Sequence, residues 1–128
     1  MLIISGIITF DPAKQAEFIA LTLPLVEATL AESGNITYGF FFDGTDPGRV
    51  RAYEEWESED AIASHMGTAH MGTFLEGMAS VGVTGAELHQ HVVAESTRIM
   101  YLPCPAQVAA LRPAPAHCSG SCSLNAVE

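Results

Sequence analysis

The stretch Glu54–Met71, EEWESEDAIASHMGTAHM, joins the end of a predicted strand to a predicted helix. Side chains of a strand alternate between its two faces, so Glu54 shares a face with Val50, Ala52 and Trp56. Its three neighbours are apolar, which predicts that this face is buried. A buried carboxylate needs a partner, and we expect Glu54 to be bonded to backbone or to an arginine, with a catalytic role as the alternative.

Two histidines occupy the helical part of the stretch, five positions apart, at His65 and His70. In one continuous helix they would point about 140° apart, at roughly 100° per residue. Gly67 and Thr68 interrupt the pattern, because glycine suits a helix C-cap and threonine can cap a second segment. The rings can then converge, and three interpretations stay open: a metal pair, a general base or hydrogen-bond donor to a ligand, and structural caps. No carboxylate stands at an evident position for a third ligand, so we predict no metal.

The segments on either side complete a regular order of strands and helices. Strands are predicted over residues 2–10, 36–43, 49–57 and 86–102, and helices over residues 11–33 and 58–80. The order is βαββαβ with a hairpin at its centre, which is typical of a ferredoxin-like α+β sandwich. We assign residues 1–102 to this domain and expect its first strand to be central.

Both helices are predicted in two pieces, and the last strand is predicted to be irregular. Pro24 lacks a backbone donor in the middle of the first helix, which predicts a kink or a break there, with Thr22 able to cap a second piece. Residues 81–85 are predicted as a turn. The strand that follows is expected to bend or bulge around residues 95–97.

The high hydrophobic content indicates that a partner protein covers part of the surface. The negative net charge argues against polyanionic ligands. Hydrophobic residues make up 48% of the 128-residue chain, and the open sheet face is best covered by a second copy of the same sheet. Fifteen acidic residues against five basic ones give a formal charge of −10. Nucleic-acid binding needs clustered cations, whereas the basic residues here are scattered: Lys14, Arg49, Arg51, Arg98 and Arg112. We expect a homodimer that binds neither nucleic acid nor membranes.

The two ends of the chain favour a cytoplasmic protein. Residues 1–10, MLIISGIITF, are apolar but lack a positive n-region and a small-residue cleavage site, and they are too short to span a bilayer. The three cysteines all lie in the last quarter and are odd in number, which does not fit a secreted disulfide framework.

Residues 103–128 form a Pro- and Ala-rich C-terminal arm that contains Cys104, Cys118 and Cys122. Together with His117 they could hold zinc, but their spacing departs from that of usual zinc sites. A disulfide clip is the second alternative. We predict separate thiols without metal, in an arm with one short helix over residues 107–112 and chiefly apolar contacts.

Other candidate groups carry weaker signals. His89 and His91 form an H-x-H on one strand face beside Glu87, and we expect solvent-facing side chains there, although metal binding stays open. Nucleotide-binding glycine motifs, a G-x-S-x-G nucleophile and a lysine placed for Schiff-base chemistry are absent. We therefore predict no cofactor.

The run E-x-W-E-S-x₆-H-x₄-H-M, which follows a βαβ unit, resembles the antibiotic biosynthesis monooxygenase family. The matching residues are Glu54, Trp56, Ser58, His65, His70 and Met71. The likeness covers residues 1–102 and implies a dimeric α+β barrel with a ligand pocket between sheet and helices. The haem-degrading branch fits poorly, because this chain has Ser5 and Gly6 near its first-strand asparagine and Leu75 near its histidine.

In the quinol-monooxygenase branch the resemblance implies oxygenation of a small aromatic or quinol-like substrate by molecular oxygen, without flavin or metal. His65 or His70 would be the catalytic base, with Tyr38 or Arg51 orienting the substrate. The apolar walls would come from Phe40, Trp56, Met66 and Phe74. The rival is a non-catalytic dimer that binds or senses a hydrophobic metabolite, and a histidine facing the pocket distinguishes the two. The substrate is not specified by the sequence.

Overall fold

The computed structural model describes residues 1–100, and Met1–Ser96 form one compact unit. Residues 97–100, which belong to a separate unit, have no regular secondary structure. The elements follow the predicted order: β1 (Leu2–Phe10), the 3₁₀ helix η1 (Pro12–Lys14), α1 (Gln15–Leu30), β2 (Asn35–Phe42), β3 (Arg49–Trp56), α2 (Glu59–Met66), α3 (Ala69–Gly77) and β4 (Val83–Val92).

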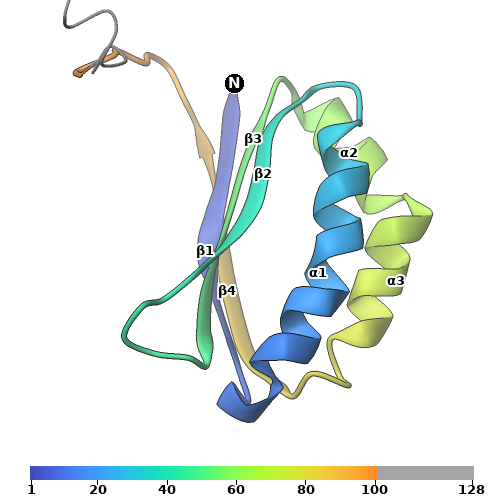
Figure 1. The fold of residues 1–128 in the computed structure, drawn as a ribbon. Coiled ribbons are helices and arrows are strands. Elements are labelled where there is room, and N and C mark those ends of the chain that lie inside the picture. The colour runs from blue at the N-terminus through green and yellow to red at the C-terminus, as the bar shows by residue number, and fades with distance from the viewer. Residues whose placement is uncertain (101–128) are drawn as a thin grey trace, which may run out of the picture. The chain divides into compact units, whose positions relative to one another are not determined.

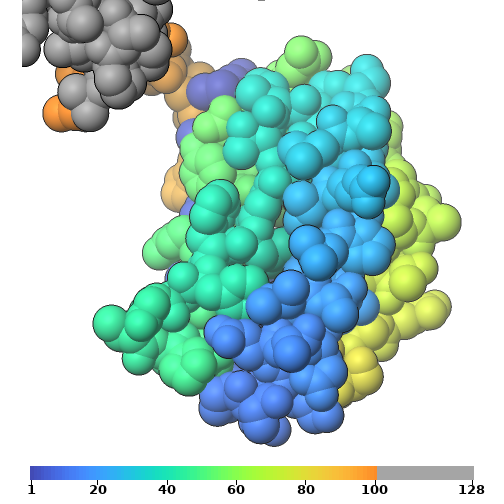
Figure 2. Space-filling model, in the orientation of Figure 1, coloured from blue at the N-terminus to red at the C-terminus, as the bar shows by residue number. Residues whose placement is uncertain are grey.

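The four strands form one antiparallel sheet in the order β2-β3-β1-β4, and the helices cover one of its faces (Figure 1). This is the ferredoxin-like α+β sandwich predicted from the sequence, with β1 central as expected. Helix α1 packs against β2 and α3, and Figure 2 shows α1 in blue beside the teal surface of β2.

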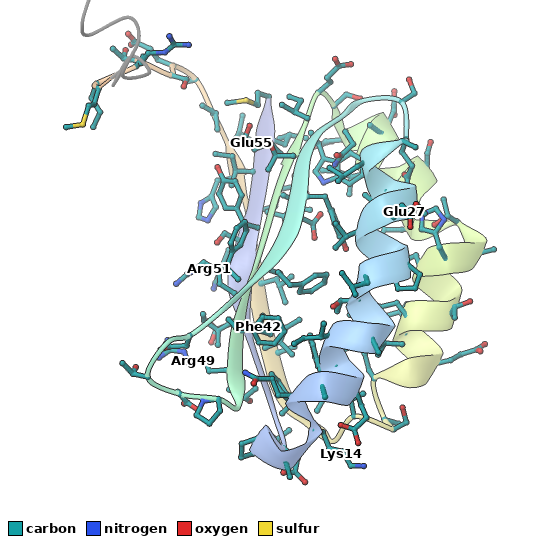
Figure 3. The ribbon with its side chains drawn as sticks, viewed as in Figure 1. Lys14, Glu27, Phe42, Arg49, Arg51 and Glu55 are labelled. Atoms are coloured by element: carbon teal, nitrogen blue, oxygen red, sulfur yellow. The ribbon has the colours of Figure 1, made fainter. Side chains whose placement is uncertain are left out.

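The alternation of β3 separates the two faces of the sheet. Val50, Ala52 and Trp56 are at most 2% exposed and Glu54 is 8% exposed, all on the helix side. Arg51 points away from the helices, whereas Phe42 of the neighbouring strand points into the layer between sheet and α1 (Figure 3). The prediction of one buried face that includes Glu54 is confirmed.

Of the kink or break predicted at Pro24, the break is wrong. Helix α1 runs unbroken from Gln15 to Leu30 with Pro24 inside it. Thr22 does not cap a second piece, because its hydroxyl donates to the carbonyl of Phe18 at 3.0 Å. Packing of α1 against the sheet holds the helix together across the missing donor.

Strand β4 is shorter than predicted and begins earlier. It starts at Val83, after Gly82 at φ +67°, a left-handed conformation that glycine adopts without strain. It ends at Val92 because Val92 pairs with Leu2, at the start of β1, and the last backbone bond joins Val93 N to Met1 O at 3.1 Å. The predicted bend at residues 95–97 therefore lies beyond the strand.

The C-terminal arm, residues 103–128, lies outside the residues that the structure describes. The predictions for its short helix, its contacts and its three cysteines concern residues that the structure does not describe. Within residues 1–100, no helix is both long and apolar enough to cross a membrane.

Candidate functional site

The break between α2 and α3 brings the two histidines together. Ser58 caps α2, accepting from Ala61 N at 3.2 Å, and α2 ends at Gly67. Thr68 then caps α3, and its hydroxyl donates to the carbonyl of His65 at 2.7 Å. His65 thus lies in the last turn of α2 and His70 in the first turn of α3, with ring centroids 6.0 Å apart. The convergence predicted from the helix break is confirmed.

A carboxylate that the sequence analysis missed joins the histidines. Glu32 follows the end of α1, and its Oε1 lies 2.8 Å from His65 Nδ1 and 2.5 Å from His70 Nε2. One signal was available in the sequence: a carboxylate just past a helix C-terminus is disfavoured by the helix dipole and needs compensation. The sequence spacing, however, did not indicate which residues would compensate the charge of Glu32.

The protonation of the cluster follows from its electrostatics. Burial by itself raises the pKa of Glu32, but hydrogen bonds from His65 and His70 outweigh it and hold the pKa below its ordinary value. Glu32 is therefore a carboxylate, and the two nitrogens that face it donate. In neutral His65 the proton then sits on Nδ1 and leaves a lone pair on Nε2. That Nε2 is buried and has no hydrogen-bond partner within the described residues.

Two aromatic rings pack close to the imidazole ring of His65. The ring of Trp56 lies 5.0 Å and that of Tyr38 5.4 Å from the His65 ring, centroid to centroid. Burial raises the pKa of Tyr38, and the charges of Glu54 and Glu32 add to the effect, so its hydroxyl stays protonated. The site thus combines an acceptor nitrogen with a neutral phenol in an apolar layer.

Glu54 is held by the tryptophan two positions along the strand. Trp56 Nε1 donates to Glu54 Oε2 at 2.8 Å. Among the described residues this partner is an indole, a kind of partner that the sequence analysis did not predict. Burial raises the pKa of Glu54, although the bond from Trp56 and the nearby His65 oppose the shift.

The structure brings most of the predicted pocket residues together. Phe40 lies 5.8 Å from Tyr38 and 5.7 Å from Phe74, centroid to centroid, so these rings line the same layer as Trp56 and His65. Arg51 is on the opposite face of the sheet, where it donates to Ser5 Oγ at 3.1 Å. Met66 is 53% exposed. These two do not join the cluster.

An acidic groove of about 430 Å³ opens beside Glu32. It is lined by Glu32, Ser33, Gly34, Glu57, Ser58, Asp60, Ala61, Ser64 and Thr68. Three of these side chains are carboxylates and none is basic, so the groove attracts cations toward the cluster.

A second histidine group lies on the open face of the sheet. His89 Nε2 is 2.9 Å from Glu87 Oε1, and the His89 and His91 rings are 6.4 Å apart, centroid to centroid. Both histidines are exposed, as predicted. With Ser5 and Arg51 they border a hollow of about 340 Å³.

Comparison with known proteins identifies the family. The sequence profile described as antibiotic biosynthesis monooxygenase matches residues 1–77, more than half of the chain. The chain belongs to the antibiotic biosynthesis monooxygenase family. The resemblance predicted from the Glu54–Met71 stretch is thereby confirmed for the family and for the fold.

Individual relatives show how far the likeness extends. The uncharacterized protein sll1783 of Synechocystis is 30% identical over 95 residues, 74% of this chain and 65% of its own length. The "Putative monooxygenase YcnE" of Bacillus subtilis is 31% identical over 75 residues, 59% of this chain and 79% of its own length. A crystal structure of a "putative antibiotic biosynthesis monooxygenase" from Deinococcus radiodurans superposes with a TM-score of 0.73, at 22% identity, over 79% of this chain and all of its own. At that identity the last comparison carries the fold alone.

Proposed function

We propose that this protein is a cofactor-independent monooxygenase acting on a small aromatic or quinol-like substrate. One observation carries the proposal: Glu32 fixes Nδ1 of His65, and the Nε2 of His65 is buried with no hydrogen-bond partner within the described residues. The rings of Tyr38 and Trp56 pack close to the His65 ring. A carboxylate that holds one imidazole nitrogen sets the tautomer and makes the other nitrogen the proton acceptor. Family membership supports the reaction class.

The chemistry needs only a base, a dry site and an oxyanion donor. His65 Nε2 takes the proton of a substrate hydroxyl or activated methylene, and the resulting electron-rich anion reduces dioxygen. For a dihydroxyarene, one oxygen atom forms a new carbon–oxygen bond and the other leaves as water, so the hydroxyquinone product needs no external reductant. The protonated Tyr38 hydroxyl donates to the developing oxyanion. Because His65 is 2% exposed, the substrate enters by displacing the side chains around it.

His70 has a supporting part in this proposal. Its Nε2 shares Glu32 Oε1 with His65, so it fixes the carboxylate that in turn fixes the base. Of the two predicted catalytic histidines, His65 is the base and His70 positions Glu32. Arg51 drops out as an orienting residue, since it lies across the sheet.

We also propose that the working form is a cytoplasmic homodimer. The open sheet face carries exposed Phe41 (56%) beside the partly buried Ile7, and a second sheet is the partner of matching shape. A compact monomer by light scattering at micromolar concentration would contradict the dimer.

Oxygen uptake over a panel of dihydroxynaphthalenes and anthrones tests the function. We expect oxygen uptake with at least one member of the panel. Isotope labelling is expected to show that the added oxygen atom comes from ¹⁸O₂ and not from water. Binding of panel members without oxygen uptake would contradict the proposed enzymatic function and favour the alternative, a non-catalytic protein that binds a metabolite. The packing of Tyr38, Phe40 and Phe74 in a continuous apolar layer is what favours that second candidate.

A further inference from the structure

We propose that Glu32, His65 and His70 form a binding site for one divalent transition-metal ion, of the class of zinc, cobalt and ferrous iron. The three side chains offer two imidazole nitrogens and one carboxylate oxygen, all within 4.8 Å of one another. Imidazole with a carboxylate suits these borderline ions, and three protein ligands leave positions open for water or a further ligand. The inference is independent of the proposed function.

The spacing of the donors is close to what an ion requires. Metal–ligand bonds of about 2.0–2.2 Å place neighbouring donors roughly 2.8–3.6 Å apart in octahedral or tetrahedral geometry. Glu32 Oε1 now lies 2.8 Å from His65 Nδ1 and 2.5 Å from His70 Nε2. An entering ion therefore spreads each of these pairs by up to about 1 Å, and the two nitrogens lie within 4.8 Å of each other.

The burial of the three side chains allows that adjustment. The His65 side chain is 2% exposed and so gives a fixed donor, whereas the His70 side chain is 27% exposed and can rotate. Glu32 is 15% exposed and lies between them. The site thus has one rigid ligand and two that adapt to the ion.

The surrounding charge favours a cation and provides a path. The groove beside Glu32 adds the carboxylates of Glu57 and Asp60, and none of the described residues that line it is basic. A metal site needs both satisfied ligands and an entry route, and this acidic groove ends at the ligand Glu32 itself.

Metal binding changes what His65 can do. An ion on Nδ1 takes the place of the proton there, so the proton of neutral His65 moves to Nε2. Nε2 then donates and no longer accepts. The metal-loaded protein consequently lacks the base of the proposed oxygenase, and metal and substrate deprotonation compete for one ring.

Cobalt(II) titration of the full chain tests the site without any substrate. Visible d–d absorption and calorimetry are expected to show one equivalent bound, with zinc displacing cobalt. E32Q keeps the shape of the side chain but loses the charged ligand, and H70Q removes a nitrogen. Each is expected to raise the Kd by more than about 100-fold, beyond the 10–100-fold typical of outer partners.

Two control variants remove the competing ligands of this chain. H89Q/H91Q deletes the exposed H-x-H pair, and a variant with Cys104, Cys118 and Cys122 all changed to serine deletes the thiols. Both are expected to bind cobalt as the wild type does. Thiolate-to-cobalt charge-transfer bands, or loss of binding in either control, would overturn the proposal.

A measurement on the wild type covers the case in which E32Q or H70Q fails to fold. Bound cobalt is expected to shift the ring-proton NMR signals of His65 and His70 and to leave those of His89 and His91 in place. The proposal is wrong if the signals of His89 and His91 shift while those of His65 and His70 stay in place, or if no equivalent of cobalt binds. Because no oxygen uptake enters these readouts, failure here leaves the proposed function standing, and the reverse also holds.

Discussion

The two faces of β3 carry the same kind of pair in different surroundings. On the helix side Trp56 Nε1 donates to Glu54 at 2.8 Å, and on the open side the Tyr53 hydroxyl donates to Glu55 at 2.6 Å, each across two positions. The histidine–glutamate pairs repeat the contrast: His65–Glu32 spans 2.8 Å with side chains 2% and 15% exposed, and His89–Glu87 spans 2.9 Å at 62% and 82%.

Distance alone therefore does not make a site in this protein. The paired bonds are of similar length, but water screens the open-face pairs and is excluded from those under the helices. Chemical activity and stability should follow burial, and most of the predictions below compare a buried group with a more exposed counterpart.

The largest expected effect separates the two histidines that each face a glutamate. H65Q removes the general base and is expected to lower kcat/KM by about 10²–10⁴-fold in oxygen-uptake assays. H89Q, on the exposed pair, is expected to leave kcat/KM within about threefold of wild type. Equal values for H65Q and wild type would remove His65 from the mechanism.

The next effect compares the two aromatic–carboxylate pairs of β3 by double-mutant cycles. The cycle of W56F with E54L is expected to give a coupling of about 1–3 kcal/mol, because a buried acceptor loses its donor. The cycle of Y53F with E55L is expected to give less than about 1 kcal/mol, since water replaces the lost bond. Urea unfolding measures both. Equal couplings would show that burial does not set the strength of these pairs.

A third, smaller effect is the pH dependence of stability, which has opposite signs for Glu32 and Glu54. Glu32 has a lowered pKa, so its contribution is present above the ordinary value of 4.5 and is lost as the pH falls through the folded-state value below it. Glu54 has a raised pKa, so its contribution is present below 4.5 and is lost as the pH rises through the folded-state value above it.

Unfolding free energies measured between pH 3 and 8, a range chosen to span roughly both transitions, test these signs. E32Q is expected to reduce the fall in unfolding free energy at acid pH. E54Q is expected to reduce the fall in unfolding free energy as the pH rises above the ordinary carboxyl pKa. Unchanged slopes in both variants would contradict the assignment of these groups as the source of the pH dependence.

The comparison also explains which parts of the site the sequence could predict. Local chemistry was enough for the strand alternation around Glu54 and for the break at Gly67, since each depends on neighbouring residues. Glu32 was missed because it lies 33 positions before His65, and the crossing of α1 with α2 and α3 depends on tertiary packing. No periodicity within one element connects residues so far apart.

The same local rules could have predicted that two of the expected pocket residues, Arg51 and Met66, lie outside the cluster. Arg51 alternates with Val50 and Ala52 along β3, so its side chain had to leave the buried face. Met66 directly follows the buried His65 on α2, which turns it about 100° away from that ring. Both were assigned to the pocket through the family resemblance, whereas in the structure neither joins the cluster around His65.

The smallest expected effect tests Met66 against Phe74, which were predicted together as pocket walls. Met66 is 53% exposed and Phe74 is 5% exposed. M66Q is expected to change the free energy of unfolding by less than about 0.5 kcal/mol, as for other surface substitutions, and to leave substrate affinity unchanged. F74L keeps an apolar side chain of similar volume and is expected to cost up to about 1.5 kcal/mol, with a measurable loss of affinity because Phe74 contacts Phe40 in the layer that holds the base. Urea unfolding and ligand titration of the two variants give the answer. A loss of affinity in M66Q would place the ligand on the outer surface of α2, and the buried layer around His65 would then not be the binding site.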